Sequence, residues 1–203
     1  MKVAITFILV LIQNFVFAQT KADYKVYSEI INHITMNKNV FKNDTLRKSI
    51  VIIENSTNNF QLSNTEITAI LDSLPSLEKP IEYQSKLVVI KMLLSFKQNS
   101  AKYNPFLNEN SLKCLFPIHL ISESEFNSYF PPIYPGIGWQ IFYSLYPKSI
   151  GVLSFSKIVY LDNLAVCFVD YSYGSLGGNE DIYIMKLIKG KWIYFNKYKI
   201  SDT

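Results

Sequence analysis

The sequence holds few of the residues that most often carry chemistry. Its 203 residues include two histidines, two cysteines and a single arginine, Arg47. It contains no Gly-Lys-Ser/Thr phosphate loop, dinucleotide fingerprint, nucleophile-elbow serine or His-Glu-x-x-His helix. The common nucleotide-binding and hydrolase classes therefore lose their main support, and no cofactor is expected.

Charge is also sparse. Only 18% of residues are charged, and the formal net charge is +4. Nucleic-acid-binding proteins gather Lys and Arg on one face and use Arg for bidentate contacts to bases and phosphates. The lysines here are dispersed along the chain, and those from Lys186 to Lys199 alternate with apolar residues as on a solvated strand face. Nucleic acid is therefore not an expected partner.

The histidines and cysteines are too few and too scattered for a metal site. His33 falls in a predicted helix and His119 in a predicted strand, far apart in the sequence. Cys114 and His119 are five residues apart on an extended stretch, which places their side chains on opposite faces and argues against a catalytic pair. Cys114 and Cys167 could form a disulfide or could both be small buried hydrophobic residues, and the sequence leaves both possibilities open.

What the sequence does contain is an export signal. Lys2 supplies a positive start, residues 3–12 form an apolar or hydroxyl run, and Ala18 is the small residue that a signal peptidase needs before Gln19. The run is too short to cross a bilayer. Residues 1–18 are therefore predicted to be a cleaved signal peptide. The mature chain has no second long apolar stretch, so it is expected in the periplasm or outside the cell without a membrane span.

The rest of the chain, 49% hydrophobic in the whole sequence, predicts a single α+β domain over residues 19–203. Residues 19–130 read as a mainly helical half and residues 139–203 as a sheet half. In the first half, apolar periodicity and Ser/Glu capping pairs predict helices at residues 24–34, 63–74 and 81–98, a further helix start at Ser122 with Glu125, and strands at 49–54 and 112–121.

In the second half the apolar period changes to alternation. It predicts a four-stranded antiparallel meander, on which the N-terminal helices pack, with strands at residues 151–160, 164–173, 181–188 and 191–200. Short turns such as Lys189-Gly190 connect them. In the last strand Trp192, Tyr194 and Tyr198 are expected on the face toward the helices, with Lys197 on the opposite face. We expect Trp192 to be a buried organiser of the sheet and not a ligand contact.

Several short motifs in this half occur in a fixed order: GWQIFY at 138–143, YPKSIG at 146–151, SFS at 154–156, YGSLGG at 173–178 and KGKW at 189–192. Over residues 139–201 the chain resembles a family of exported Bacteroidetes proteins of unknown function. Members of that family often carry a Cys pair around the Gly-rich hairpin, where Tyr173 and Gly177 stand here. The resemblance implies export and no particular activity.

The aromatic residues give one candidate binding site. The loop at residues 130–139 combines prolines, which lower the entropy lost on binding, with the rings of Tyr134 and Trp139. Gly136 and Gly138 would let a ligand approach the backbone closely. The alternative is that Trp139 plugs the end of the sheet and anchors a turn at residues 140–146.

Acidic residues give the only lead toward an enzyme. Asp170 lies in the second predicted meander strand, and Glu180 and Asp181 open the third, so the Gly-rich turn could bring their carboxylates together. The alternative is a solvated hairpin tip, which is far more common.

Two hypotheses of different class follow. The preferred one is a non-catalytic exported domain that binds a small molecule, glycan or protein. The other is a hydrolase that uses the Asp170, Glu180 and Asp181 carboxylates. A hydrolase should hold these carboxylates in a concave pocket, whereas a binding module should expose the aromatic loop.

Overall fold

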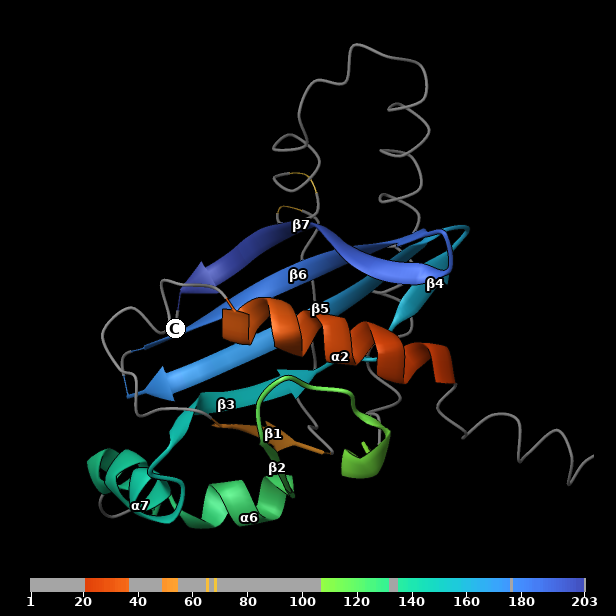
Figure 1. Ribbon diagram of the computed structural model, residues 1–203. Coiled ribbons are helices and arrows are strands. Elements are labelled where there is room, and N and C mark those ends of the chain that lie inside the picture. Colours follow the sequence, from red (N-terminus) through yellow and green to blue (C-terminus); the bar gives the residue numbers. More distant parts are fainter. Residues whose placement is uncertain are drawn as a thin grey trace, which may run out of the picture.

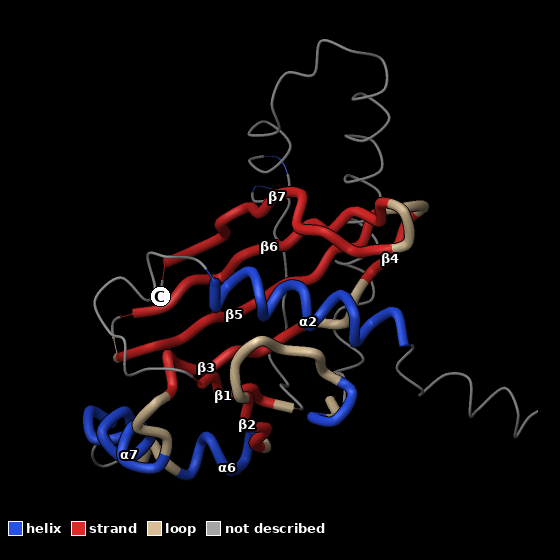
Figure 2. Tube along the Cα trace, in the orientation of Figure 1, coloured by secondary structure: helices blue, strands red, loops and turns tan. Residues whose placement is uncertain are grey.

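The structure is a computed structural model, and it describes Thr65, Thr68 and residues 21–36, 49–54, 107–131, 135–175 and 177–202. In this part of the chain the fold is α+β, with one seven-stranded sheet of mixed strand direction and helices on both of its faces (Figures 1 and 2). The predicted signal peptide lies outside the described residues. So do the predicted helices at 63–74 and 81–98, apart from Thr65 and Thr68.

The sheet has the order β2-β1-β3-β5-β6-β7, and β4 also pairs with β5. Strand β1 is parallel to β2 and β3, and the remaining pairs are antiparallel. The strands are β1 (Ser49–Ile53), β2 (Ile118–Ile121), β3 (Ser149–Phe155), β4 (Val159–Leu161), β5 (Leu164–Gly174), β6 (Gly177–Ile188) and β7 (Lys191–Asp202). The helices are α2 (Lys21–Met36), α6 (Glu123–Ser128) and α7 (Gly138–Leu145), with 3-10 turns η2 (Glu109–Ser111) and η3 (Pro135–Ile137).

The predicted four-stranded meander is correct only for its last three strands, β5, β6 and β7. The predicted strand at 151–160 is broken into β3 and β4, which lie one after the other along β5. At the break the hydroxyl of Ser156 accepts a hydrogen bond from the backbone N–H of Phe168 at 2.9 Å. In an unbroken strand pair a backbone carbonyl would accept this bond. Strands β1 and β2 from the N-terminal half then extend the sheet beyond β3.

The strand predicted at residues 112–121 is also shorter than expected, because only β2 joins the sheet. The N–H groups of Lys113 and Leu115 bond to the side chains of Ser28 and Asn32 on α2 instead of to a neighbouring strand. Pro117 has no N–H to donate. The segment before β2 is therefore attached to a helix.

Helix α2 confirms the helix predicted at 24–34 and covers one face of the sheet (Figure 1). Its buried stripe repeats every three or four residues, as an amphipathic helix requires. The Tyr27 hydroxyl donates a 3.0 Å hydrogen bond to the carbonyl of Ser156 and so joins helix and sheet. The core on this face includes Ile30, Ile50 and Leu153.

Helices α6 and α7 pack on the opposite face. Val51 and Ile53 of β1 point toward them, whereas Ile50 and Ile52 point toward α2. Parallel strands are usually covered on both faces, so their sequences are continuous apolar runs without alternation. The sequence of β1 fits this position.

At the start of α6, the Ser122 part of the predicted Ser122/Glu125 capping pair is confirmed, and the Glu125 part is not. Ser122 Oγ accepts the backbone N–H of Glu125 at 3.0 Å. The Glu125 carboxylate accepts from the hydroxyls of Tyr129, at 2.7 Å, and Tyr146, at 3.2 Å. Glu125 thus connects α6 to the residue that follows α7.

A β-bulge corrects the predicted faces of the last strand. Met185 pairs with Tyr194, and Ile184 pairs with Asn196, so Phe195 is an extra residue in β7. The alternation therefore reverses from Asn196 to Lys199, and a second register shift follows at Ile200. Lys197, expected on the outer face, lies on the α2 face with Trp192 and Tyr194, whereas Tyr198 lies on the other face.

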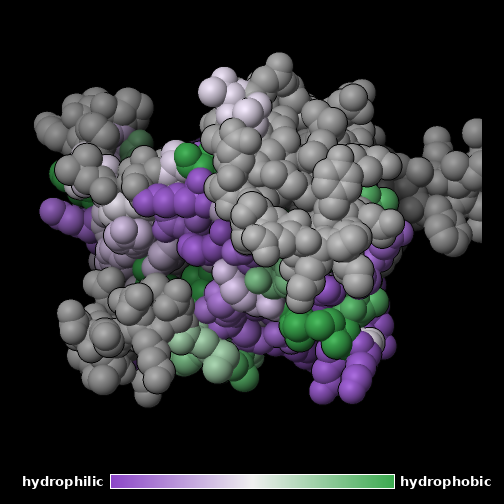
Figure 3. Space-filling model, turned by 90° about the horizontal axis from the view of Figure 1, so that it is seen from above, coloured by the Kyte–Doolittle hydropathy of each residue, from purple (hydrophilic) through white to green (hydrophobic). Residues whose placement is uncertain are grey.

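The outer surface of the described residues is mixed. Seen from above in Figure 3, it is mostly hydrophilic with small separate hydrophobic patches. Within the described ranges no helix has the length and apolar character needed to cross a membrane.

Candidate functional site

The structure brings two of the three candidate carboxylates together. Asp170 and Glu180 are direct partners across β5 and β6 and point to the same face. Asp181 is on the opposite face, only 2% exposed, and one of its oxygens accepts from Lys197 Nζ at 2.7 Å. Consecutive residues of a strand point to opposite faces, so Glu180 and Asp181 cannot serve one pocket.

Asp170 has an unusual environment. Burial, and then the nearby Glu180 charge, raise its pKa to about 6, although the hydrogen bond from Ser172 opposes this rise. It lines a cavity of about 80 Å³ together with Glu123 and Asn127 of the α6 region. Ligand sites for drug-sized molecules span roughly 300 to 1,000 Å³, so this cavity suits water or a small ion and not a sugar ring.

The aromatic loop is largely packed where the structure describes it. The Trp139 ring makes edge contacts with Phe126, Phe130 and Phe142 at centroid distances of 5.4 to 6.1 Å. Gly138 is buried under Phe130, because a Cβ there would lie 2.0 Å from a ring carbon.

Gly136 is exposed, and Tyr134 lies outside the described residues. The turn expected at residues 140–146 is instead mostly helix α7. The contacts of Trp139 place it in the aromatic cluster of α6 and α7, which packs on the sheet face opposite α2. The ligand role of the loop stays a prediction.

The histidines and cysteines occupy structural positions. His33 stacks on Tyr194 with ring centroids 3.7 Å apart, and burial followed by the Lys197 charge lowers its pKa. Cys114 and Cys167 are both free thiols, and burial raises their pKa values to about 11 and about 12. Among the residues that the structure describes, no three His, Cys, Asp or Glu side chains are grouped to hold a metal ion.

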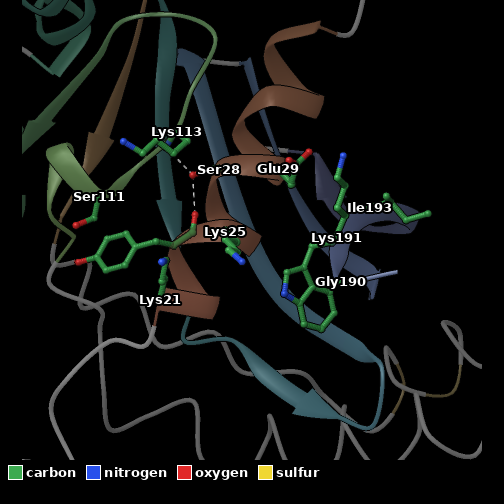
Figure 4. Close-up of a pocket in the computed structure, with 11 residues that line it drawn as sticks. Lys21, Lys25, Ser28, Glu29, Ser111, Lys113, Gly190, Lys191 and Ile193 are labelled. Atoms are coloured by element: carbon green, nitrogen blue, oxygen red, sulfur yellow. Dashed lines mark hydrogen bonds between the residues drawn. The ribbon is translucent and has the colours of Figure 1, made fainter. Parts of the chain in front are cut away.

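A larger groove lies in a region that no sequence motif had indicated. It has a volume of about 950 Å³ and lies between the first half of α2, the segment before β2 and the β6–β7 turn (Figure 4). Aromatic side chains line it at Tyr24 and Trp192, and lysines line it at Lys21, Lys25, Lys113 and Lys191.

One wall of the groove is held by hydrogen bonds to α2. The Ser28 hydroxyl accepts the N–H of Lys113 at 2.8 Å and donates to the carbonyl of Tyr24 at 2.6 Å, as the dashed lines in Figure 4 show. One turn along the helix, the Asn32 amide donates to the Lys113 carbonyl and accepts the N–H of Leu115. The backbone position of Lys113 is therefore set by two side chains of one helix face.

The other wall starts at a tight turn that the sequence predicted correctly. Lys189 and Gly190 have φ values of 49° and 78°, the pair of positive angles that a type I′ hairpin requires. The turn places Lys191 and Trp192 at the start of β7. The Trp192 ring packs against Tyr160 at 5.7 Å, and the Tyr160 hydroxyl donates to Asp23 of α2 at 2.6 Å.

The sequence expectation for Trp192 is thus half confirmed. Its side chain is 8% exposed and belongs to the core under α2, as predicted for an organiser of the sheet. It also lines the groove, so a ligand there would meet its accessible edge.

Comparisons with protein-family models, with curated proteins and with solved structures find no match for this chain. The resemblance to the exported Bacteroidetes family accordingly stays a prediction. The function is therefore inferred from the geometry of the described residues.

Proposed function

We propose that the mature chain is an exported, non-catalytic binding domain that takes a small molecule in the groove beside α2. The observation that carries this proposal is the groove itself. Its volume of about 950 Å³ lies in the range of ligand sites, and its lining pairs the rings of Tyr24 and Trp192 with a few polar groups.

The groove is also organised before any ligand arrives. Ser28 and Asn32 fix the segment that carries Lys113, and the type I′ turn fixes the start of β7. A preformed site loses less entropy on binding than one that must order its walls. This rigidity supports a recognition role.

The groove chemistry favours binding over catalysis. The Ser28 hydroxyl is engaged twice, as an acceptor from Lys113 and a donor to Tyr24, so its proton is held by a backbone carbonyl and not by a general base. The described groove residues include no histidine or cysteine. A nucleophile and its base are the minimum that covalent hydrolysis needs.

The alternative hydrolase has one observation in its favour, the pKa of Asp170 raised to about 6 beside Glu180. A carboxyl with a raised pKa is what a general acid requires. The adjoining cavity of about 80 Å³ has no room for a glycoside, and Asp181 points to the other face. The binding domain is therefore the better-supported function.

Export is part of the same proposal and depends on the N-terminal pattern of Lys2, the apolar run and Ala18. N-terminal sequencing of the protein from the cell envelope or the medium tests it. The expected first residue is Gln19. An intact Met1 in the membrane fraction would refute it.

Filling the groove tests the binding site. Ser111 is exposed and lines the groove, so Ser111→Phe should occupy part of its volume. The matched control is Ser144→Phe on the exposed side of α7. We expect N-phenyl-1-naphthylamine, a neutral dye that fluoresces in apolar sites, to bind Ser111→Phe about tenfold more weakly than wild type, a loss of about 1.4 kcal/mol. Equal dye affinity in wild type and both variants would contradict the proposed site.

A further inference from the structure

The lysines of the groove come from three separate parts of the fold. Lys21 and Lys25 extend from one side of α2, Lys113 from the segment before β2 and Lys191 from the start of β7 (Figure 4). They do not form one cluster in the sequence, because α2, the segment before β2 and the start of β7 are far apart along the chain. Folding therefore creates a local positive charge that the chain's modest net charge of +4 does not suggest.

The acidic residues that the structure describes offset little of this charge. Glu29 is the one acidic residue among the described groove residues, and no salt bridge within the described part of the chain involves the four lysines. Lys197 shows the contrast, since its amino group pairs with Asp181 at 2.7 Å. A cleft lined by one sign of charge attracts ligands of the opposite sign.

The same groove offers apolar surface. The rings of Tyr24 and Trp192 form part of its lining, and the alkyl stems of lysines can cover apolar groups while their amino groups stay in water. A bare anion would use the lysines but leave these rings exposed. A neutral apolar molecule would use the rings but leave the positive charge without a partner.

We propose that the groove selects an anionic amphipathic ligand, in which a carboxylate, sulfate, sulfonate or phosphate group is joined to an apolar body. The anionic group pairs with the lysines, and the apolar body lies against Tyr24 and Trp192. This inference rests on the proposed function, since it names the ligand class of the same groove. A volume of about 950 Å³ leaves room for a body much larger than an inorganic ion.

Two dyes of similar size separate charge from apolar contact. The first is 8-anilinonaphthalene-1-sulfonate, which is anionic, and the second is the neutral N-phenyl-1-naphthylamine. Lys25→Glu and Lys191→Glu reverse one groove charge each, and Lys148→Glu reverses an exposed charge in the turn before β3. We expect each groove variant to bind the anionic dye about tenfold more weakly, with the neutral dye changed less than about twofold. Lys148→Glu should change neither affinity by more than about twofold.

Two further measurements sharpen the test. Lys25→Arg keeps the charge and should keep most of the affinity for the anionic dye, whereas Lys25→Gln should lose it. Displacement of the bound dye by decanoate indicates an acyl body and displacement by 2-naphthoate a ring body. Either displacement supports the ligand class, and displacement by neither overturns it.

The failure of this inference is distinguishable from failure of the proposed function. If Ser111→Phe weakens the neutral dye but the charge reversals affect both dyes equally or not at all, the groove binds ligands without selecting anions. If Ser111→Phe changes neither dye, the groove is not a binding site and both proposals fail.

Discussion

The hydroxyl of Ser28 on α2 accepts the backbone N–H of Lys113 across a distance of 2.8 Å. These residues are far apart in the sequence, and this bond, together with those of Asn32, sets how the segment before β2 lies along the helix. Because Lys113 and Ser28 both line the groove, the bond also sets the shape of the proposed site. The stability of the fold and the form of the groove are coupled at this point.

Removing this bond tests the coupling. Ser28→Ala leaves the Lys113 N–H without its acceptor, which should cost about 1 to 2 kcal/mol of unfolding free energy. Urea denaturation measures the change. The control is Ser144→Ala, whose exposed hydroxyl bonds only to a carbonyl in its own helix and whose loss should cost less than about 0.5 kcal/mol. Equal stability of the two variants would show that the Ser28 bond does not hold the segment.

Asp170 should make stability depend on pH. Its pKa is about 6 in the folded chain against an ordinary value of 3.8, so between these values the folded state holds a proton that the unfolded chain has released. The free energy of unfolding should therefore fall as pH rises from about 4 to about 6, by about 1 to 3 kcal/mol from this group.

Asp170→Asn removes that titration. The variant should be more stable than wild type at pH 7.5 and should lose the slope between pH 4 and 6, measured by thermal unfolding across this range. Asp162→Asn, at the exposed turn between β4 and β5, is the control and should keep the wild-type slope. An unchanged slope in Asp170→Asn would mean that Asp170 titrates as an ordinary surface carboxyl.

Gly151 occupies a position that only glycine fits. Its φ is +146°, and a Cβ there would lie 2.5 Å from the carbonyl oxygen of Ser172 in β5. Gly151→Ala should therefore destabilise the fold by about 2 to 3 kcal/mol. Gly136→Ala is the control, because no atom lies within 4 Å of the added Cβ, and its unfolding free energy should change by less than about 0.5 kcal/mol. A wild-type melting temperature in Gly151→Ala would contradict the strand geometry.

Trp192 should be more important for stability than its neighbour three positions along β7. Trp192→Ala removes a ring that is 8% exposed and should cost about 3 to 5 kcal/mol. Phe195 is 52% exposed at the bulge, and Phe195→Ala should cost less than about 1 kcal/mol. Comparable losses in chemical denaturation would mean that the burial of Trp192 is not what organises this end of the sheet.

The elements that sequence reasoning found are those set by local interactions. The period of α2, the Ser122 cap and the Lys189-Gly190 turn each depend on residues a few positions apart. The parallel pairing of β1 with β2 and β3 joins segments separated by more than 60 residues, and no local pattern specifies it. The bulge at Phe195 was missed because one extra residue reverses the faces of the residues that follow it without changing the alternating composition.

The candidate sites also divide into one set by local interactions and one set by tertiary packing. Register explains why Asp170 meets Glu180, since a short hairpin connects their strands, and strand alternation explains why Asp181 does not. The groove needed tertiary information, because Lys25, Lys113 and Lys191 line one groove only after α2 has packed on the sheet. No spacing rule links these three lysines in the sequence.

The two tryptophans give the sharpest test of the groove, because Trp192 lines it and Trp139 lies on α7 in the aromatic cluster. Each gives one indole N–H signal in an ¹⁵N-labelled protein, and Trp139→Phe and Trp192→Phe assign the two. On titration of the chain from Gln19 onward with 8-anilinonaphthalene-1-sulfonate, the account predicts that the Trp192 signal shifts in a saturable way and the Trp139 signal does not. A saturable shift of Trp139 with Trp192 unmoved would place the site at the loop and contradict the groove.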